Sequence, residues 1–225
     1  MSKKTIINRI RYILGFAGII GPVLFLSITV SLDVLQSSPD QVIKTVSDLV
    51  HGSYGWLQNL AFASLAFCFL LFITKLYVFT KRKLSSLAGI LMLSITGIGF
   101  ILITIFPSQV SGLGQTLQGL LHDSIAGLIA TSFMLGCIAF THHFRKDPHW
   151  KNYWIYTLIT VILCFSFAML WALLPREWQI EGVGERLLLI SAFAWVMVIS
   201  LKLMKMHRQS QETVAVPVYI ERDLD

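Results

Sequence analysis

Residues 120–141 of the chain read LLHDSIAGLIATSFMLGCIAFT. As an α-helix this run is long enough to cross the roughly 30 Å hydrocarbon core of a bilayer, because a helix rises about 1.5 Å per residue. His122 and Asp123 stand at its beginning, although a membrane helix needs neither for its stability. The run therefore predicts a membrane helix whose first turns mark a candidate site.

Further apolar runs of similar length occupy much of the 225-residue chain, and only 13% of its residues are charged. An average soluble protein has about 25% charged residues. We therefore expect an all-α membrane protein, with one six-helix transmembrane domain over residues 1–205 and a polar tail over 206–225. The expected spans are 12–32, 54–79, 84–106, 120–141, 153–174 and 185–203.

The first long loop carries the pattern of a short helix. Ser38, Pro39 and Gln41 read as an N-cap, a proline at the first helical position and the closing residue of a capping box. Apolar residues follow at helical spacing. We expect an amphipathic helix over residues 39–50 at the membrane surface, and its apolar face consists of Val42, Val46, Leu49 and Val50.

Small and charged residues within the other runs predict further details. Gly15, Gly18 and Gly21 recur every three residues and form a smooth strip for close helix contact. Pro22 leaves the carbonyl of Gly18 without its helical partner, so we expect a kink there. Lys75 lies near the end of the second run, and we expect its long side chain to reach the polar interface.

The distribution of charge predicts the orientation. With six spans, the N-terminus, the loops at 80–83 and 142–151 and the C-terminal tail share one side, which holds 14 of the 18 Lys and Arg residues. By the positive-inside rule, both termini are cytoplasmic in a multi-pass protein of the cell (plasma) membrane. The net charge of +6 is thus a topology signal. A nucleic-acid partner is not expected, because no dense basic patch is present.

The candidate site lies at the outer ends of spans two, four and six. Their helix N-termini carry partial positive charge, and polar residues gather at all three beginnings. Asp123 shares a stripe with Gly127 and Ala130, which we expect to pack inward. We therefore expect an ion pair between Asp123 and Arg186. The candidate ligand-binding residues are Asp48, His51, His122, Asp123 and Arg186.

These residue types leave several roles open. An ion pair near the membrane surface either holds two helices together or receives a ligand. His51 and His122 could ligate a metal together with nearby carboxylates, but no tight ligand-spacing motif is present. No two histidines face each other within the spans, which disfavours haem. We expect no cofactor, and the sequence identifies no catalytic residue.

Short segments along the chain resemble, in their order, the bacterial and archaeal membrane family known as domain of unknown function 998. The likeness covers roughly residues 10–205 and implies a membrane domain of six or seven helices without an assigned activity. The family shows a neutral residue at the position of Glu185, which favours Arg186 as the site residue. The segments are Gly21-Pro22-Val23-Leu24-Phe25, Thr45-Val46-Ser47-Asp48-Leu49, Gly55-Trp56-Leu57-Gln58, Phe106-Pro107, His122-Asp123-Ser124-Ile125-Ala126-Gly127 and Gly184-Glu185-Arg186-Leu187.

Three functions compete at this point. The first is a non-catalytic binding or accessory protein whose outer rim holds a lipid headgroup or a small anion, with membrane lipids or a membrane protein as partners. The second is a membrane-embedded lipid hydrolase or transferase, with or without a metal, in which His51 or His122 acts as base; a nucleophile signature is missing. The third is a small transporter built from inverted repeats, which the uncharged midplane of the spans disfavours.

Overall fold

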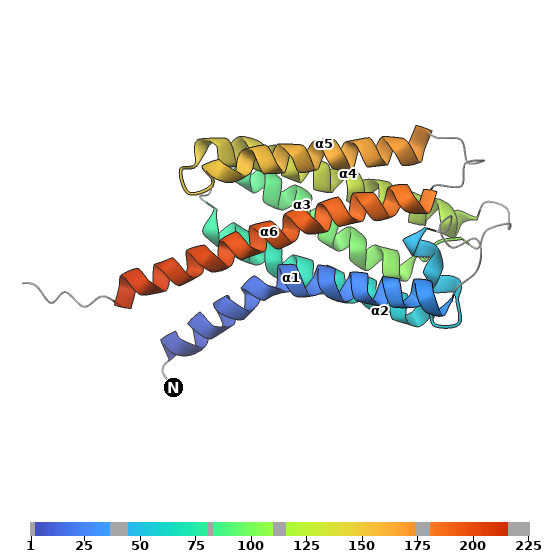
Figure 1. Cartoon of the computed structure of the whole chain (residues 1–225), viewed down its shortest axis with the longest axis horizontal. Helices are drawn as coiled ribbons and strands as arrows, with labels where there is room; N and C mark the ends of the chain where they lie inside the picture. The colour runs from blue at the N-terminus through green and yellow to red at the C-terminus, as the bar shows by residue number, and fades with distance from the viewer. Residues whose placement is uncertain (1–2, 37–44, 81–82, 110–115, 174–180, 216–225) are drawn as a thin grey trace, which may run out of the picture.

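The computed structural model describes residues 3–36, 45–80, 83–109, 116–173 and 181–215 (Figure 1). Within these ranges the chain forms six α-helices and two short 3-10 helices, and no strand. In chain order they are α1 (Lys3–Leu35), η1 (Val46–His51), α2 (Gly55–Phe79), α3 (Leu84–Ile105), α4 (Leu117–Lys146), η2 (Lys151–Tyr153), α5 (Trp154–Leu173) and α6 (Glu181–Ala215).

All six α-helices are long and apolar enough to cross a membrane, which confirms the predicted fold class. Three of them extend beyond the expected spans. Helix α1 begins at Lys3, α4 continues to Lys146, and α6 continues to Ala215, so the first part of the expected polar tail is helical. The extensions are rich in Lys, Arg, Gln and Glu, which are good helix formers in water.

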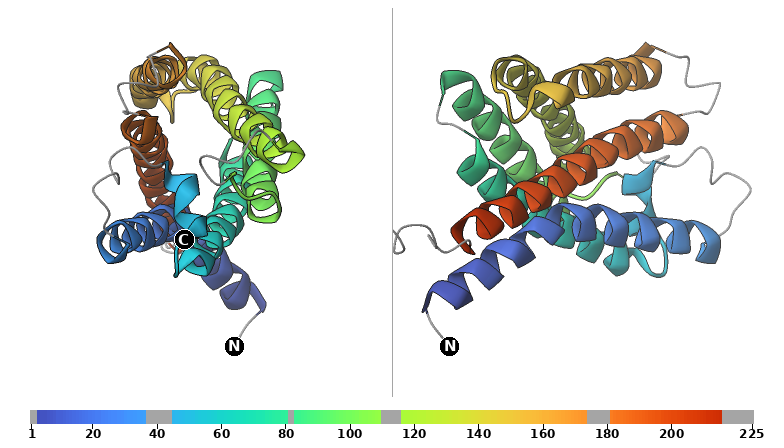
Figure 2. Two further views of the ribbon diagram at one scale, coloured as in Figure 1. Left: turned by 90° about the vertical axis from the view of Figure 1, so that its right-hand side faces the viewer. Right: turned by 60° about the vertical axis from the view of Figure 1, so that its left-hand side comes forward.

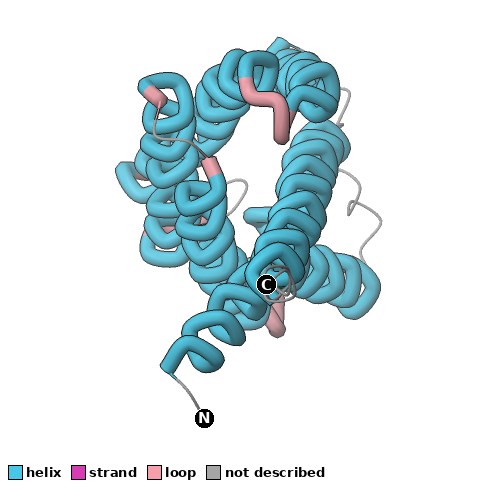
Figure 3. The backbone as a smooth tube through the Cα atoms, turned by 90° about the vertical axis from the view of Figure 1, so that its left-hand side faces the viewer, coloured by secondary structure: helices cyan, strands magenta, loops and turns pink. Residues whose placement is uncertain are grey.

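The six α-helices form a closed ring (Figures 2 and 3). Each helix packs against the next one in the sequence, and α6 returns to α1. The beginning of α1 and the end of α6 lie at the same end of the bundle (Figure 1). We call the opposite end, where α2, α4 and α6 begin, the rim. The ring order places α5 between α4 and α6.

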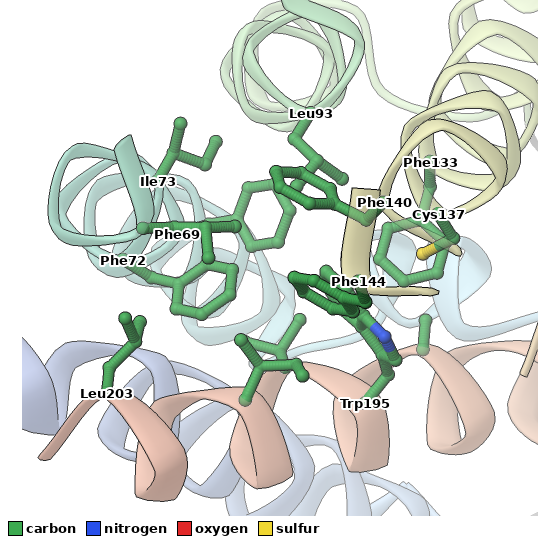
Figure 4. Packing of buried hydrophobic residues seen from close by; sticks show 14 of the residues in the cluster. Phe69, Phe72, Ile73, Leu93, Phe133, Cys137, Phe140, Phe144, Trp195 and Leu203 are labelled. Carbon is green, nitrogen blue, oxygen red and sulfur yellow. The ribbon is translucent and has the colours of Figure 1, made fainter. Parts of the chain in front are cut away.

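An aromatic cluster packs inside the ring (Figure 4). Trp195 of α6 is fully buried, makes edge-on ring contacts with Phe72 and Phe133, and donates its indole N–H to Thr157 of α5 at 3.0 Å. Tightly packed rings of this kind stabilise beyond the area that they bury. The cluster therefore holds α2, α4, α5 and α6 together.

The glycine strip of α1 makes the close contacts that the sequence predicted. A side chain at Gly18 would overlap Ser200 of α6 and Phe72 of α2, and one at Gly21 would lie 2.7 Å from Cys68 Cβ. Pro22 lies inside α1, and Figure 1 shows this helix bent. Small residues let helix backbones approach closely, which is how helices pack in lipid.

The predicted short helix of the first long loop is present as η1, with 3-10 geometry. Its N-cap is Thr45, whose backbone N–H donates to the Asp48 carboxylate at 3.1 Å. The earlier start expected at residue 39 and the proposed cap at Ser38 lie outside the described residues. Val46 and Leu49 are buried in the bundle. The apolar face of this element therefore covers the rim end of the helices.

The prediction for Lys75 was wrong. Its side chain does not reach the interface and is only 3% exposed. The amine lies against Gly15 of α1 and beside Met204 of α6. Because Gly15 has no side chain, the lysine fills that space, which sequence position alone did not reveal.

Candidate functional site

Arg186 lies in the second turn of α6 and pairs with Asp33 near the end of α1. Its Nη2 donates to both carboxylate oxygens, at 2.9 and 3.2 Å, and its Nη1 donates to the Gly182 carbonyl at 3.1 Å. Both side chains of the pair are about three-quarters buried (24% and 25% exposed). This charge-assisted contact joins the first and last helices of the ring at the rim.

The predicted ion pair between Asp123 and Arg186 is therefore wrong. No hydrogen bond or ion pair links the two within the part of the chain that the structure describes. The physical reason is the ring order, because α4 and α6 are separated by α5, whereas α1 and α6 are neighbours.

The stripe that includes Asp123 and Gly127 also does not pack inward. Asp123 is exposed, and the space beside Gly127 is open. The buried face of α4 instead carries His122, Ile125 and Ile129. Bulky residues determine which face of α4 is buried, since Ile129 packs onto Gly99 of the neighbouring α3.

Glu185 holds η1 against the beginning of α6. Its Oε2 accepts the backbone N–H of Val46 at 2.6 Å, and its Oε1 accepts the Ser47 hydroxyl at 3.4 Å. The carboxylate thus satisfies a free N–H at the beginning of the short helix. In Figures 1 and 2, η1 (light blue) lies beside the beginning of α6.

The two rim histidines attach to the segment that follows α3. His51 Nε2 lies 2.7 Å from the Ser108 carbonyl oxygen, and His122 Nδ1 lies 2.8 Å from the Phe106 carbonyl oxygen. A carbonyl oxygen only accepts, so each of these nitrogens carries a proton. The histidines bind backbone positions two residues apart, so both side chains lie beside the segment that follows α3.

Ser108 extends this network to η1. Its hydroxyl donates to the Ser47 carbonyl at 3.0 Å and lies 3.1 Å from His51 Nε2. Four of the five candidate residues therefore have protein partners, and Asp123 has none among the described residues. The described residues contain no group of three His, Cys, Asp or Glu side chains that could hold a metal ion.

Sequence reasoning missed three residues that organise the rim: Asp33, Ser108 and Glu185. Asp33 and Glu185 each had a signal, because each is an acid at the end of an apolar run. The sequence favoured Arg186 over Glu185 because the family that the chain resembles has a neutral residue at position 185. Ser108 had no signal beyond its position after Pro107.

One small cavity lies inside the ring below the rim. A cavity of about 30 Å³ lies among α2, α3, α4 and α6, and its lining is apolar apart from Thr96. The Thr96 hydroxyl is 2.8 Å from that of Ser132, so this polar group is satisfied. Such a cavity has room for about one water-sized group and no charge to bind a polar substrate.

Comparisons with known proteins give a family and no activity. No curated protein and no solved structure matches the chain. A family model described as "Protein of unknown function (DUF998)" matches residues 19–202, and the chain, whose described residues form six helices apolar enough to span a membrane, belongs to this family.

Proposed function

We propose that the chain is a non-catalytic lipid-binding protein of the cell membrane, and that Asp123 at the rim binds the amine of a lipid headgroup. The observation that supports this most directly is the state of Asp123. It is exposed, and among the described residues it makes no hydrogen bond or ion pair, whereas the other candidate residues are engaged.

The position of Asp123 suits a headgroup. It is the seventh residue of α4, so it lies about 9 Å from the beginning of the helix. Leu120 and Leu128 on the same helix are exposed. A carboxylate at this depth among lipid-facing leucines is costly unless a partner from outside the chain neutralises it.

The sign of the charge selects the headgroup. The described rim carries the carboxylates of Asp33, Asp48, Asp123 and Glu185 against the single guanidinium of Arg186, which Asp33 already binds. An anion would meet net repulsion there, which disfavours the small-anion ligand expected from the helix N-termini. A primary amine, as in phosphatidylethanolamine, meets net attraction.

The alternatives have weaker support. A lipid hydrolase or transferase using His51 or His122 needs an activated nucleophile beside the base. Instead, His51 Nε2 and His122 Nδ1 each donate to a backbone carbonyl. A transporter needs a polar site near the midplane, whereas the cavity found inside the ring is lined by apolar residues apart from Thr96.

Native mass spectrometry of the full chain tests the proposal. The protein is titrated with phosphatidylethanolamine and, separately, with phosphatidylglycerol. We expect preferential retention of phosphatidylethanolamine and a roughly tenfold weaker retention in Asp123→Asn, since a charged hydrogen bond contributes about 1.5–3 kcal/mol. Asp123→Glu should keep the preference, and Ser124→Ala, an exposed neighbour, serves as the control.

Three results would decide against the proposal. Equal retention of the two lipids by the wild type would show that the headgroup amine does not determine binding. Unchanged retention by Asp123→Asn would show that this residue does not bind the lipid. Cleavage of the added lipid, visible as a mass change, would favour the hydrolase instead.

A further inference from the structure

Lys75 places a positively charged group inside the bundle, far from the rim. It lies four residues before the end of α2 at Phe79, so its Cα is about 6 Å from that end. The side chain is 97% buried, since 3% of its surface is exposed. Among the described residues its Nζ has no hydrogen-bond partner. A buried ammonium without a partner is strongly destabilising.

The amine reaches the seam between α1 and α6. A side chain at Gly15 of α1 would meet the Lys75 amine and, at 2.8 Å, the Met204 side chain of α6. Lys75 therefore extends from α2 to the line where the first and last helices of the ring meet. The aromatic cluster lies behind it, with Phe72 and Leu76 of the same helix fully buried.

A second donor without a partner lies on the same seam. Ser200 of α6 is fully buried, and within the described part of the chain its hydroxyl has no hydrogen-bond partner. It lies against Gly18, which is one turn along α1 from Gly15. Two independent polar side chains thus point into one strip of small residues.

The described charges that follow this strip on α6 are positive. Lys202 and Lys205 come directly after Ser200 in the sequence of this helix. Lys202 lies over the ring of Tyr153, and His207 is buried beside the ring of Phe79. No described carboxylate bonds to Lys75. Donors with net positive charge are complementary to an anion, and phosphate is the common anion at this depth of a membrane.

We propose that Lys75 and Ser200 form a binding site for a phosphate group at the seam of α1, α2 and α6, in the half of the bundle that bears the termini. Met204 borders this seam beside Gly15, and its flexible side chain can turn aside to admit the phosphate. The phosphate belongs to a lipid headgroup or to a free phosphate ion, and both present the same oxygens to the amine. This site is independent of the function proposed for the rim.

The experiment measures the melting temperature of the full-length protein in neutral detergent. Phosphatidylglycerol, inorganic phosphate and a neutral diacylglycerol are added separately. We expect phosphatidylglycerol to raise the melting temperature of the wild type and the neutral lipid not to do so. A rise with inorganic phosphate as well identifies free phosphate as a ligand, whereas a rise with the lipid alone identifies the headgroup.

Three variants assign the effect to the site. In Lys75→Met the phosphate-dependent rise should disappear, while the unliganded protein should melt at the same or a higher temperature, because an unpaired buried charge has been removed. Ser200→Ala should weaken binding roughly tenfold, the loss of a hydrogen bond to a charged group. Lys205→Met removes an exposed charge from the same end of α6 and should keep the rise.

The proposal is wrong if neither phosphate compound stabilises the wild type more than the neutral lipid does. It is also wrong if Lys75→Met retains the full rise, because the stabilisation then comes from surface charges. An equal loss in Lys75→Met and Lys205→Met would likewise show a general effect of charge and not a site.

Discussion

Replacing Asp33 by asparagine removes one charge from the ion pair that joins α1 to α6 at the rim. At a separation of about 4 Å and an effective dielectric constant of about 20, the attraction between the charges is about 4 kcal/mol. Desolvation and side-chain ordering offset much of it. Exposed pairs contribute up to about 1 kcal/mol, whereas breaking a fully buried pair costs about 3–5 kcal/mol.

The geometry places this pair between those limits. Asp33 and Arg186 are about a quarter exposed (25% and 24%), and the guanidinium makes two bonds to the carboxylate, the shorter at 2.9 Å. We expect Asp33→Asn to destabilise the protein by about 2 kcal/mol. For a chain of this length, that corresponds to a fall of roughly 4–8 °C in melting temperature.

A double-mutant cycle isolates the contact. Melting is followed in detergent for Asp33→Asn, Arg186→Gln and the double variant, and we expect a coupling energy of about 1–2 kcal/mol. The matched control is Asp123→Asn, an exposed acid at the same end of the bundle. It should not lower stability by more than about 0.5 kcal/mol, and it should show no coupling to Arg186→Gln. Coupling of Arg186 to Asp123 in place of Asp33 would refute the ring order and the reasoning from it.

Three further predictions test other parts of the structure. Glu185→Gln should weaken the hold on η1, so the Val46 amide should exchange with deuterium faster than in the wild type; unchanged exchange would contradict the role of this carboxylate. Gly18→Val should lower the melting temperature by several degrees because it overlaps Ser200 and Phe72, whereas Gly127→Ala, in open space, should raise stability by up to about 1 kcal/mol. If both termini are cytoplasmic, an impermeant thiol reagent should label single cysteines at positions 44, 112 and 180 from outside, and labelling at 82 or 147 would reverse the orientation.

The amino-acid sequence by itself determined the helical membrane architecture. The free energy of transferring a segment into lipid depends on the hydrophobicity of its own side chains, and its backbone hydrogen bonds form within the segment. Each span can therefore be predicted without knowledge of its neighbours. The number of helices was predictable for this reason. The glycine contacts of α1 were predictable because small residues mark the faces where helices approach closely. The polar residues at the beginnings of α2, α4 and α6 could also be predicted from the sequence, because they interrupt the apolar runs.

Only the tertiary structure decided which polar groups meet. A carboxylate at Asp33 and one at Asp123 are equally plausible partners for Arg186 until the ring places α1 beside α6 and α5 between α4 and α6. Successive residues of a helix point about 100° apart. The rotation of α4 about its own axis therefore decides that His122 is buried and Asp123 is exposed. That rotation depends on the bulk of side chains on neighbouring helices. The same dependence left Lys75 inside the bundle, because the space that receives its amine belongs to Gly15, sixty residues earlier in the chain.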